Sequence, residues 1–392
     1  MLLFILSFGI GVSLAQDSLK IMYYNLLNYP DASPERSDTL RKIVQYVSPD
    51  VFVVNELMTE VGADLILNES LNQFGTSTFQ RAAFVDGTDT DNMLFYNSDK
   101  LGLVTQTQIE TSLRDFSEYV LYYKSPGLNA SSDTVYLHFY SAHLKAGAGD
   151  FAQRADEAQI LKNYLNSRTG LENVFVGGDF NFYSGNEEGC YILRTSGSVE
   201  LFDPLDEIGD WSANWVYADL HTQSTRMSSF GDGSGGGMDD RFDLIFVSDD
   251  VLSNENGVAY IEDSYWALGQ DGGRYNQSII SPTNFSVPDS VSQALYWMSD
   301  HLPVVMDVEL DYTASVESLI NPESLIHQKG NQLIFDEQLV GTNLLVFDTQ
   351  GRKVRDTRIS FTTFTLELPT GYYLMIVPLE DELVRKKIFV HE

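Results

Sequence analysis

The sequence is poor in cysteine and in basic residues. Among 392 residues there is one cysteine, Cys190, so no intramolecular disulfide can form and stability must come from a large core. Cys190 follows a glycine- and glutamate-rich run that predicts a loop, and no histidine stands near it in sequence to make it catalytic. The 24 lysines and arginines are outnumbered by 56 acidic residues, which gives a formal net charge of −32. This balance excludes a protein that coats DNA by neutralising phosphates, but it is compatible with an enzyme that binds phosphate through divalent cations.

Long hydrophobic runs are also scarce, and the one prominent run is at the N-terminus. Residues 2–14 are nearly all apolar, and Ser13-Leu14-Ala15 before Gln16 fits a small-residue cleavage site. We therefore predict a signal peptide over residues 1–15, with a buried strand or helix as the alternative. The run is too short to span a bilayer comfortably, and no later stretch is long and apolar enough. The sequence thus predicts a protein that is secreted or held on the outer cell surface, without stable membrane insertion.

Apolar β-rich runs alternate with helical or loop stretches from residue 19 to about residue 310. The runs are rich in Val, Ile, Phe and Tyr and are bounded by Gly, Pro, Asp or Asn, which is typical of strands. Strands mixed with helices predict a layered α/β domain over residues 16–312. The predicted strands are 19–24, 51–54, 92–96, 135–142, 173–177, 241–247 and 302–310, and the predicted helices are 33–46 and 151–167.

The composition changes after residue 312. Short β-rich runs are separated there by turn sequences such as Asp-Thr-Gln-Gly and Pro-Thr-Gly. This pattern predicts a small all-β domain, a β-sandwich, over residues 313–392. Its predicted strands are 332–335, 342–348, 363–368, 372–378 and 387–391.

Polar side chains stand at the ends of several apolar runs of the larger domain, where active sites of layered α/β folds tend to lie. Asn25 and Glu56 each end such a run. An acidic group directly after a buried strand is costly unless it is paired or bound to metal. Glu56 is therefore a candidate Mg²⁺ ligand with Asn25 beside it, although a strand-end cap explains each residue alone equally well.

A second group of polar residues contains two histidines. Asp179 and Asn181 are two apart, so on an extended chain their side chains share a face; an Asx-turn is the alternative. Histidine is the residue best suited to proton transfer near neutral pH, and His143 and His301 both border acidic motifs. Asp243 is a candidate to orient a histidine. The remaining histidines have weaker contexts, and His138, inside an apolar run, is predicted to be structural.

In order along the chain, these motifs resemble those of the endonuclease/exonuclease/phosphatase superfamily over about residues 19–310. The resemblance implies two packed mixed β-sheets flanked by helices, a four-layered α/β sandwich. The motifs that carry it are Tyr24-Asn25, Asn55-Glu56, Ser141-Ala-His143, Gly177-Gly-Asp179-Phe-Asn181, Arg241-Phe-Asp243 and Ser299-Asp300-His301.

The same resemblance implies a role for each residue. Glu56, with Asn25 and Asp300, would hold Mg²⁺, with Mn²⁺ or Ca²⁺ as alternatives. His301, oriented by Asp243, would be the general base or the electrostatic partner of the attacking water. The residues that would position that water and the phosphate, or assist the leaving group, are Asp179, Asn181 and His143.

Further residues are candidates for supporting roles. Asp115, which follows Arg114, resembles an acidic residue that some deoxyribonucleases place behind the first histidine, and it would orient His143; a surface ion pair is the alternative. Basic residues are sparse around the motifs. The nearest candidates for phosphate contact are Lys145, Arg154, Arg226 and Arg241.

The tail carries a second resemblance, to the C-terminal sorting domain of the type IX secretion system. It rests on the sequence around Leu344–Val354, on Leu-Pro-Thr-Gly-Tyr-Tyr-Leu at 368–374 and on Arg-Lys-Lys-Ile-Phe-Val at 385–390. The resemblance implies that residues 313–392 engage the type IX secretion machinery. A carbohydrate-binding or adhesive module is the alternative.

Taken together, these features predict a secreted metal-dependent phosphodiesterase, an endonuclease that hydrolyses DNA or RNA as a substrate rather than holding it as a tight ligand. One alternative is a lipid head-group or phosphomonoester hydrolase on the same scaffold, whose membrane-contacting aromatics would be Tyr265-Trp266 or Tyr296-Trp297. Another is a non-catalytic surface binding protein.

Overall fold

The computed structural model describes residues 16–30, 36–125, 134–229, 231–311, 325–378 and 383–391. The chain divides into two compact units, one of residues 1–125 and 134–312 and the other of residues 126–133 and 313–392. The predicted signal peptide, residues 1–15, lies outside the described residues.

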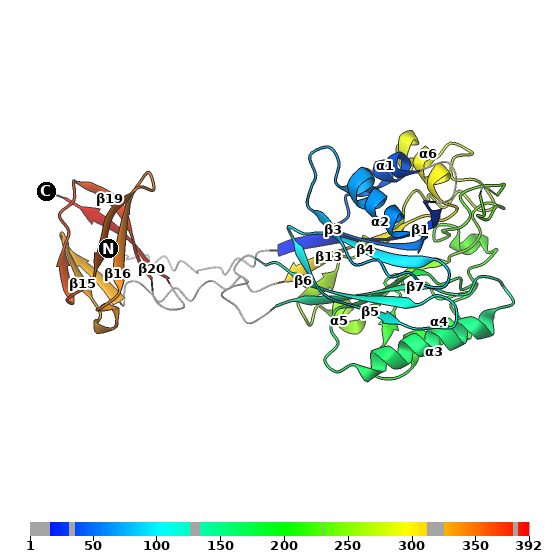
Figure 1. Cartoon of the computed structure of the whole chain (residues 1–392), viewed down its shortest axis with the longest axis horizontal. Coiled ribbons are helices and arrows are strands. Elements are labelled where there is room, and N and C mark those ends of the chain that lie inside the picture. Colours follow the sequence, from blue (N-terminus) through cyan, green and yellow to red (C-terminus); the bar gives the residue numbers. More distant parts are fainter. Residues whose placement is uncertain are drawn as a thin grey trace, which may run out of the picture. The chain divides into compact units, whose positions relative to one another are not determined.

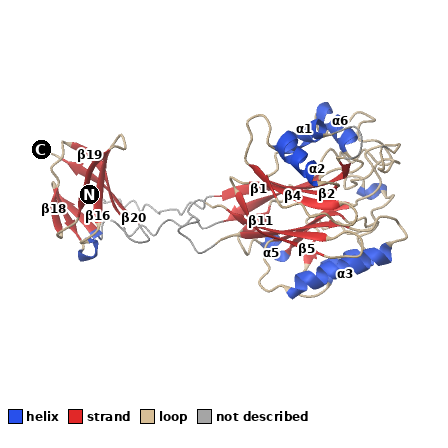
Figure 2. Ribbon diagram, in the orientation of Figure 1, coloured by secondary structure: helices blue, strands red, loops and turns tan. Residues whose placement is uncertain are grey.

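Two mixed β-sheets form the centre of the larger unit (Figures 1 and 2). The first has the strand order β11-β13-β1-β2-β4-β3, with β12 beside β13, and the second has the order β5-β6-β7-β8-β10-β9. The strands of the first sheet are β1 (Gln16–Tyr29), β2 (Val51–Leu57), β3 (Phe79–Arg81), β4 (Asp91–Asn97), β11 (Val258–Tyr260), β12 (Trp266–Ala267) and β13 (Val304–Asp311). Those of the second are β5 (Leu101–Ile109), β6 (Phe116–Tyr123), β7 (Tyr136–His143), β8 (Val174–Asp179), β9 (Leu201–Phe202) and β10 (Asp243–Ser248).

Helices cover the outer faces of both sheets, as Figure 1 shows. The first sheet is covered by α1 (Ser37–Val47), α2 (Glu60–Leu65) and α6 (Asp289–Met298), and the π-helix η1 (Ile66–Leu71) follows α2 directly. The second is covered by α3 (Phe151–Ser167), α4 (Glu188–Thr195) and α5 (Asp249–Ser253). A further short 3₁₀ helix is η2 (Trp215–Tyr217). Buried Leu40, Ile43, Val44 and Val47 give α1 one apolar face at helical spacing. The predicted four-layered α/β sandwich is confirmed.

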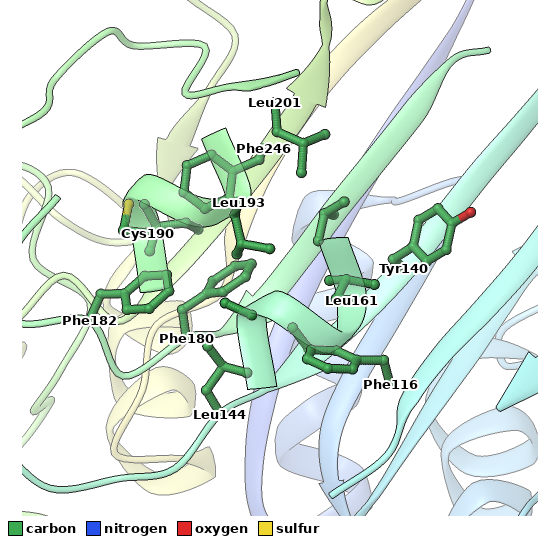
Figure 3. Packing of buried hydrophobic residues seen from close by; sticks show 14 of the residues in the cluster. Phe116, Tyr140, Leu144, Leu161, Phe180, Phe182, Cys190, Leu193, Leu201 and Phe246 are labelled. Carbon is green, nitrogen blue, oxygen red and sulfur yellow. The ribbon is translucent and has the colours of Figure 1, made fainter. Parts of the chain in front are cut away.

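A cluster of buried apolar side chains fills the space between the second sheet and α3 and α4 (Figure 3). Phe180 stacks on Phe182 with ring centroids 5.5 Å apart and meets Phe246 edge-on at 5.2 Å. Cys190 is fully buried in this cluster, on α4. The prediction of a loop at Cys190 was therefore wrong, because the residues after Glu187 begin a helix whose apolar face packs on the sheet. Burial also raises the pKa of the Cys190 thiol to about 12, which keeps it protonated.

The predicted elements match the observed ones to within a few residues at most ends. The helix predicted at 151–167 coincides with α3, and the strand predicted at 19–24 lies inside the longer β1. The hairpin of β5 and β6 and the helices α4 and α6 were not predicted. In β5 the run Thr-Gln-Thr-Gln is half-exposed, so it lacks the apolar residues that mark a buried strand.

The C-terminal unit consists of two antiparallel sheets. One has the order β14-β15-β18 and the other β17-β16-β19-β20. Their inner faces share a core that includes Ile326, Leu344, Met375 and Ile388. The predicted small all-β fold is confirmed. The strands are β14 (Ile326–Lys329), β15 (Gln332–Phe335), β16 (Asn343–Asp348), β17 (Lys353–Arg358), β18 (Thr363–Thr365), β19 (Gly371–Pro378) and β20 (Leu383–Val390), with the 3₁₀ helix η3 (Glu337–Leu339) between β15 and β16.

Among the described residues, the helices are all too short or too polar to cross a membrane.

Candidate active site

Strand pairing delivers the polar residues to one end of the two sheets. In the second sheet, β8 lies between β7 and β10, and Asp179 is paired with His143 on one side and with Asp243 on the other. In the first sheet, β1 and β2 run parallel, so Asn25 lies beside Asn55 and just before Glu56. Chain direction and register therefore bring together residues more than 200 positions apart in sequence.

The two sheets are joined at this end by buried amide side chains. Asn25 Nδ2 donates to Asp179 Oδ2 across the sheets at 3.0 Å and to Glu56 Oε1 at 2.9 Å. Asn55 Nδ2 donates to Ser141 Oγ at 3.0 Å, while its Oδ1 accepts from Asp179 N at 3.3 Å. Because these amides are fully buried and hydrogen-bonded, they fix the spacing of the carboxylates.

The backbone is unusual where the two sheets meet. A Cβ on Gly178, whose φ is +133°, would lie 2.1 Å from Ala142 O, so only glycine fits before Asp179. Glu56 and Asn181 have φ values of +58° and +53°, which L-residues rarely adopt. Such local strain is typical of functional sites, where packing holds side chains in one orientation.

His301 and Asp243 form a buried pair. His301 Nδ1 and Asp243 Oδ2 are 2.7 Å apart, and each residue is at most 3% exposed. The bond to a carboxylate places the Nδ1 proton and leaves Nε2 to accept a hydrogen bond. Gln223 Nε2 lies 2.6 Å from that Nε2 and donates to Asp300 Oδ2 at 3.1 Å.

Asp179 lies between the two histidines. Its Oδ2 is 3.5 Å from His143 Nε2 and 3.7 Å from His301 Nε2. Its Oδ1 accepts from Asn181 N at 3.1 Å, and Asn181 Nδ2 in turn donates to Leu144 O at 3.2 Å. Both imidazole Nε2 atoms therefore lie within 4 Å of one carboxylate oxygen.

One cleft of about 430 Å³ is lined by Glu56, His143, Asp179, Asn181, Gln223, Asp300 and His301. Its walls carry the carboxylates of Glu56, Asp89, Asp179, Asp232 and Asp300, and a single lysine or arginine among the lining residues, Arg114. The crowding shows in the carboxylate pKa values. Burial raises the pKa of Glu56, and burial together with Asp243 and Glu56 raises that of Asp179 to about 7. A cation in the cleft would relieve this repulsion.

The two histidines respond to the cleft in opposite directions. Burial lowers the pKa of His143 well below its usual value, and Arg114 and His301 act in the same direction. For His301 burial also lowers the pKa, but Asp243, Asp179 and Asp300 outweigh it, so the pKa is raised well above its usual value. The neutral form of His143 and the protonated form of His301 are therefore favoured.

One group of side chains in the cleft can hold a metal ion. Oxygen atoms of Glu56 and Asp179 and a ring nitrogen of His143 all lie within 4.8 Å of one another. His143 Nε2 is 3.8 Å from Glu56 Oε1. Two carboxylates and one imidazole form a donor set that suits a divalent cation.

This group differs from the predicted metal ligands Glu56, Asn25 and Asp300. Asn25 directs its amide NH₂ at the carboxylates, and its Oδ1 accepts from Leu27 N at 3.0 Å, so its oxygen is already engaged. In this structure Asn25 therefore positions the carboxylates of Glu56 and Asp179, and its role as a metal ligand stays a prediction. Asp300 lines the cleft, where its Oδ2 accepts from Ser234 N at 2.7 Å.

Asp115 does not reach His143. Its Oδ1 accepts from Thr111 N at 2.9 Å, and it lines a separate small cavity. Within the described residues, His143 Nδ1 is buried without a hydrogen-bond partner. The predicted orienting role of Asp115 is therefore corrected, and it is Arg114, next to it in sequence, that lines the cleft.

Three of the four arginines and lysines predicted to contact phosphate are buried in the protein interior instead. Arg154, Arg226 and Arg241 are each at most 1% exposed. Arg154 pairs with Glu187, Arg226 Nε donates to Tyr296 O at 2.7 Å, and Arg241 binds Asp203 through both terminal nitrogens at 2.7 and 3.0 Å. None of the three lines the cleft, so these predictions are corrected. Lys145 is next to the cleft residue Ala146, and its Nζ donates to Ala146 O at 2.8 Å.

Two residues of the site had no predicted role. Gln223 contacts His301 and stands in no recognised motif, whereas Asn55, which links the sheets, belongs to the Asn55-Glu56 motif. The glycine-rich loop around residues 231–237 also forms a wall of the cleft. A Cβ on Gly233 would lie 3.0 Å from Asp300 Cγ, so glycine lets this loop approach the carboxylate.

Comparison with known proteins gives a family match and several structural neighbours. The sequence model described as Endonuclease/Exonuclease/phosphatase family matches residues 22–301. No curated protein matches the sequence. An endonuclease/exonuclease/phosphatase family protein of Bacteroides thetaiotaomicron is 18% identical, with a TM-score of 0.48, covering 76% of this chain and 99% of that chain.

Two other solved structures are similar to the same extent. D. rerio TDP2 complexed with single strand DNA product is 14% identical with a TM-score of 0.47, covering 74% of this chain and 98% of that chain. A mannosyl-6-phosphatase of Bacteroides thetaiotaomicron is 16% identical with a TM-score of 0.46, covering 74% and 99%.

Proposed function

This chain belongs to the endonuclease/exonuclease/phosphatase family, and on that premise we propose that it is a secreted phosphodiesterase that uses a divalent metal ion to hydrolyse nucleic acid. The observation that carries the proposal is the His301–Asp243 pair facing Asp179 within the same cleft as Glu56 and His143. A His–Asp pair supplies a base, and a cluster of carboxylates supplies a cation site.

Glu56, Asp179 and His143 would hold the ion, with Asp300 close by on the cleft wall. When bound, a Mg²⁺ or Mn²⁺ ion neutralises the phosphate and stabilises the charge that develops in the transition state. The donors fit a divalent cation because oxygens of two carboxylates and a ring nitrogen of one imidazole lie within 4.8 Å of one another, and Arg114 is the one lysine or arginine that lines the cleft.

The protein's own residues would move the proton. His301 accepts a proton from the attacking water at Nε2, the nitrogen that Gln223 contacts in this structure, while Asp243 holds the ring and stabilises the imidazolium. Asp179 accepts a hydrogen bond from the same water.

The charge of the cleft favours a substrate with one anionic phosphate at the reacting centre. Arg114 is the one basic side chain among its lining residues, whereas a substrate with several phosphomonoester groups would need more cations. Of the two aromatic pairs, Tyr265 is buried, at 8% exposure, and its hydroxyl accepts from Ile245 N at 3.0 Å, whereas Trp297 is 47% exposed. A phosphodiester of nucleic acid is the substrate class that these features support best.

The proposal is tested by hydrolysis of plasmid DNA, RNA and bis(p-nitrophenyl) phosphate by the full chain, with Mg²⁺ or Mn²⁺ and with EDTA. His301→Ala is the matched inactive variant. We expect metal-dependent cleavage of at least one nucleic acid that His301→Ala loses by about 10²-fold or more. Cleavage of sphingomyelin alone would reassign the substrate, and inactivity on every phosphoester would favour a binding protein.

We also propose that the protein is exported, with residues 1–15 as signal peptide and residues 313–392 as a type IX secretion domain. The support is the sequence of both ends, together with a C-terminal unit that has its own apolar core. Expression in a type IX-competent host, with and without residues 313–392, tests this proposal. Equal release of both forms into the medium would contradict it.

A further inference from the structure

The loop between β3 and β4, together with the first two residues of β4, carries an aspartate-rich run that the proposed reaction does not use. Residues 86–92 read Asp-Gly-Thr-Asp-Thr-Asp-Asn, and they lie against the turn that joins β5 to β6. Thr88 Oγ1 donates to Leu113 O at 2.8 Å, and Asn92 Nδ2 donates to Asp115 O at 2.9 Å. The two segments line a cavity of about 20 Å³, which is large enough for one ion or one water.

Buried oxygen atoms around this cavity lack partners. Asp91 lines the cavity and is 6% exposed; its Oδ1 accepts from Gly87 N at 2.8 Å. Within the described part of the chain, Asp91 Oδ2 and Thr90 Oγ1 are buried without any hydrogen-bond partner. Leaving a buried carboxylate oxygen unpaired is costly, so a ligand is expected there.

The cavity is also negatively charged. Burial, with Asp86, Asp115 and Asp89 nearby, raises the pKa of Asp91 to about 6. Arg114 is the one basic residue that lines the cavity, and its Nε is 2.9 Å from Asp89 Oδ2, so one carboxylate already balances it. The remaining charge calls for a cation.

We propose that this loop binds a Ca²⁺ ion through Asp91 Oδ2 and Thr90 Oγ1, at a site separate from the metal of the cleft. Ca²⁺ takes six to eight oxygen ligands in flexible geometry, and the Asp115 carboxylate and loop carbonyls are the other oxygens at hand. No histidine or cysteine lines the cavity, so its chemistry does not favour zinc.

Two further observations fit this assignment. A Cβ on residue 87 would lie 2.9 Å from Asp91 Oδ1, so Gly87 is what allows the loop to fold around the carboxylate. Thr90 and Arg114 line both this cavity and the catalytic cleft. A bound ion would therefore hold one wall of the cleft in place without taking part in the reaction.

The test is the melting temperature of the full chain as Ca²⁺ is titrated. It is run on wild type and on Glu56→Gln, which removes a ligand of the cleft. At a Ca²⁺ concentration about 100-fold above Kd, the melting temperature should rise by about 5 °C in both proteins. Asp91→Asn should abolish the rise, whereas the exposed control Asp99→Asn should keep it. Asp91→Asn should melt no lower than wild type without Ca²⁺, because the substitution removes repulsion.

Thr90→Val is the second variant, and it decides the matter if Asp91→Asn does not fold. It keeps the shape of the side chain and should weaken Ca²⁺ binding about tenfold or more, as isothermal titration calorimetry would measure. No rise in wild type at about 10 mM Ca²⁺, a concentration that saturates even weak extracellular calcium modules, would assign the cavity to a buried water and overturn the proposal. A rise that Glu56→Gln loses would place the ion in the cleft instead.

Discussion

Replacing Asp243 by asparagine should slow hydrolysis while leaving the fold intact. The carboxylate lies 2.7 Å from His301 Nδ1 in a buried site, and asparagine has nearly the same shape. The substitution removes the charge that stabilises the imidazolium and allows the ring to take the wrong tautomer. Because one oriented base contributes about 10²–10⁴-fold, we expect kcat to fall by about that factor, which corresponds to about 3–5 kcal/mol in the activation barrier.

The assay is steady-state hydrolysis of bis(p-nitrophenyl) phosphate across pH, with thermal melting as the check on folding. Asp243 is the first of the carboxylates that raise the pKa of His301, so in the variant that pKa falls and the acidic limb of the residual rate moves to lower pH. Asp249→Asn changes an exposed aspartate that begins α5 directly after the same strand; it is the matched control and should retain full activity. A kcat for Asp243→Asn within threefold of wild type would refute the role of the pair.

Three further outcomes are expected. Asn25→Ala removes the hydrogen bonds to Glu56 and Asp179, so the metal concentration for half-maximal rate should rise about tenfold, measured by Mg²⁺ titration. Arg114→Ala should raise KM for a phosphodiester about tenfold with a smaller change in kcat; an unchanged KM would count against phosphate contact. Burial raises the pKa of Glu118, but hydrogen bonds to its carboxylate outweigh this and lower the pKa from 4.5 to about 2. The ionised carboxylate therefore stabilises the folded state by about 3 kcal/mol above pH 4.5, and this stabilisation is lost as the pH falls toward 2. In Glu118→Gln, the free energy of unfolding should lack this pH-dependent contribution in an acid titration.

Much of the fold could be predicted because the central strands are apolar runs with clear ends. The strand after Pro49 and the helix after Asp150 show in the sequence as a buried run and a long helical stretch. Edge strand β5 could not be predicted in the same way, since its alternating Thr and Gln face solvent and give no apolar signal. Cys190 shows the converse difficulty: the run before it looks like a loop, and only tertiary packing buries the short helix that follows.

The sequence indicated which residues belong to the candidate site but not which atoms of these residues contact one another. Strand ends indicated which residues face the cleft, because parallel neighbours end at the same edge of a sheet. Hydrogen-bond direction is invisible in a sequence, so the amide of Asn25 could not be distinguished from a metal ligand. The sequence also does not show whether a basic side chain is buried. Arg241 was predicted to contact phosphate, but in the structure it is buried and makes two hydrogen bonds to Asp203.

A Mg²⁺ titration of phosphodiester hydrolysis, run on wild type and on Glu56→Gln, bears on every role assigned to the cleft. We expect saturable activation of wild type that EDTA abolishes and added metal restores. In Glu56→Gln the same titration should give a rate at least about 10²-fold lower, or require about tenfold more metal, because the variant loses one of the grouped donors. Hydrolysis by wild type that persists in EDTA, or a Glu56→Gln curve that overlays the wild-type curve, would contradict a metal-assisted reaction at this site.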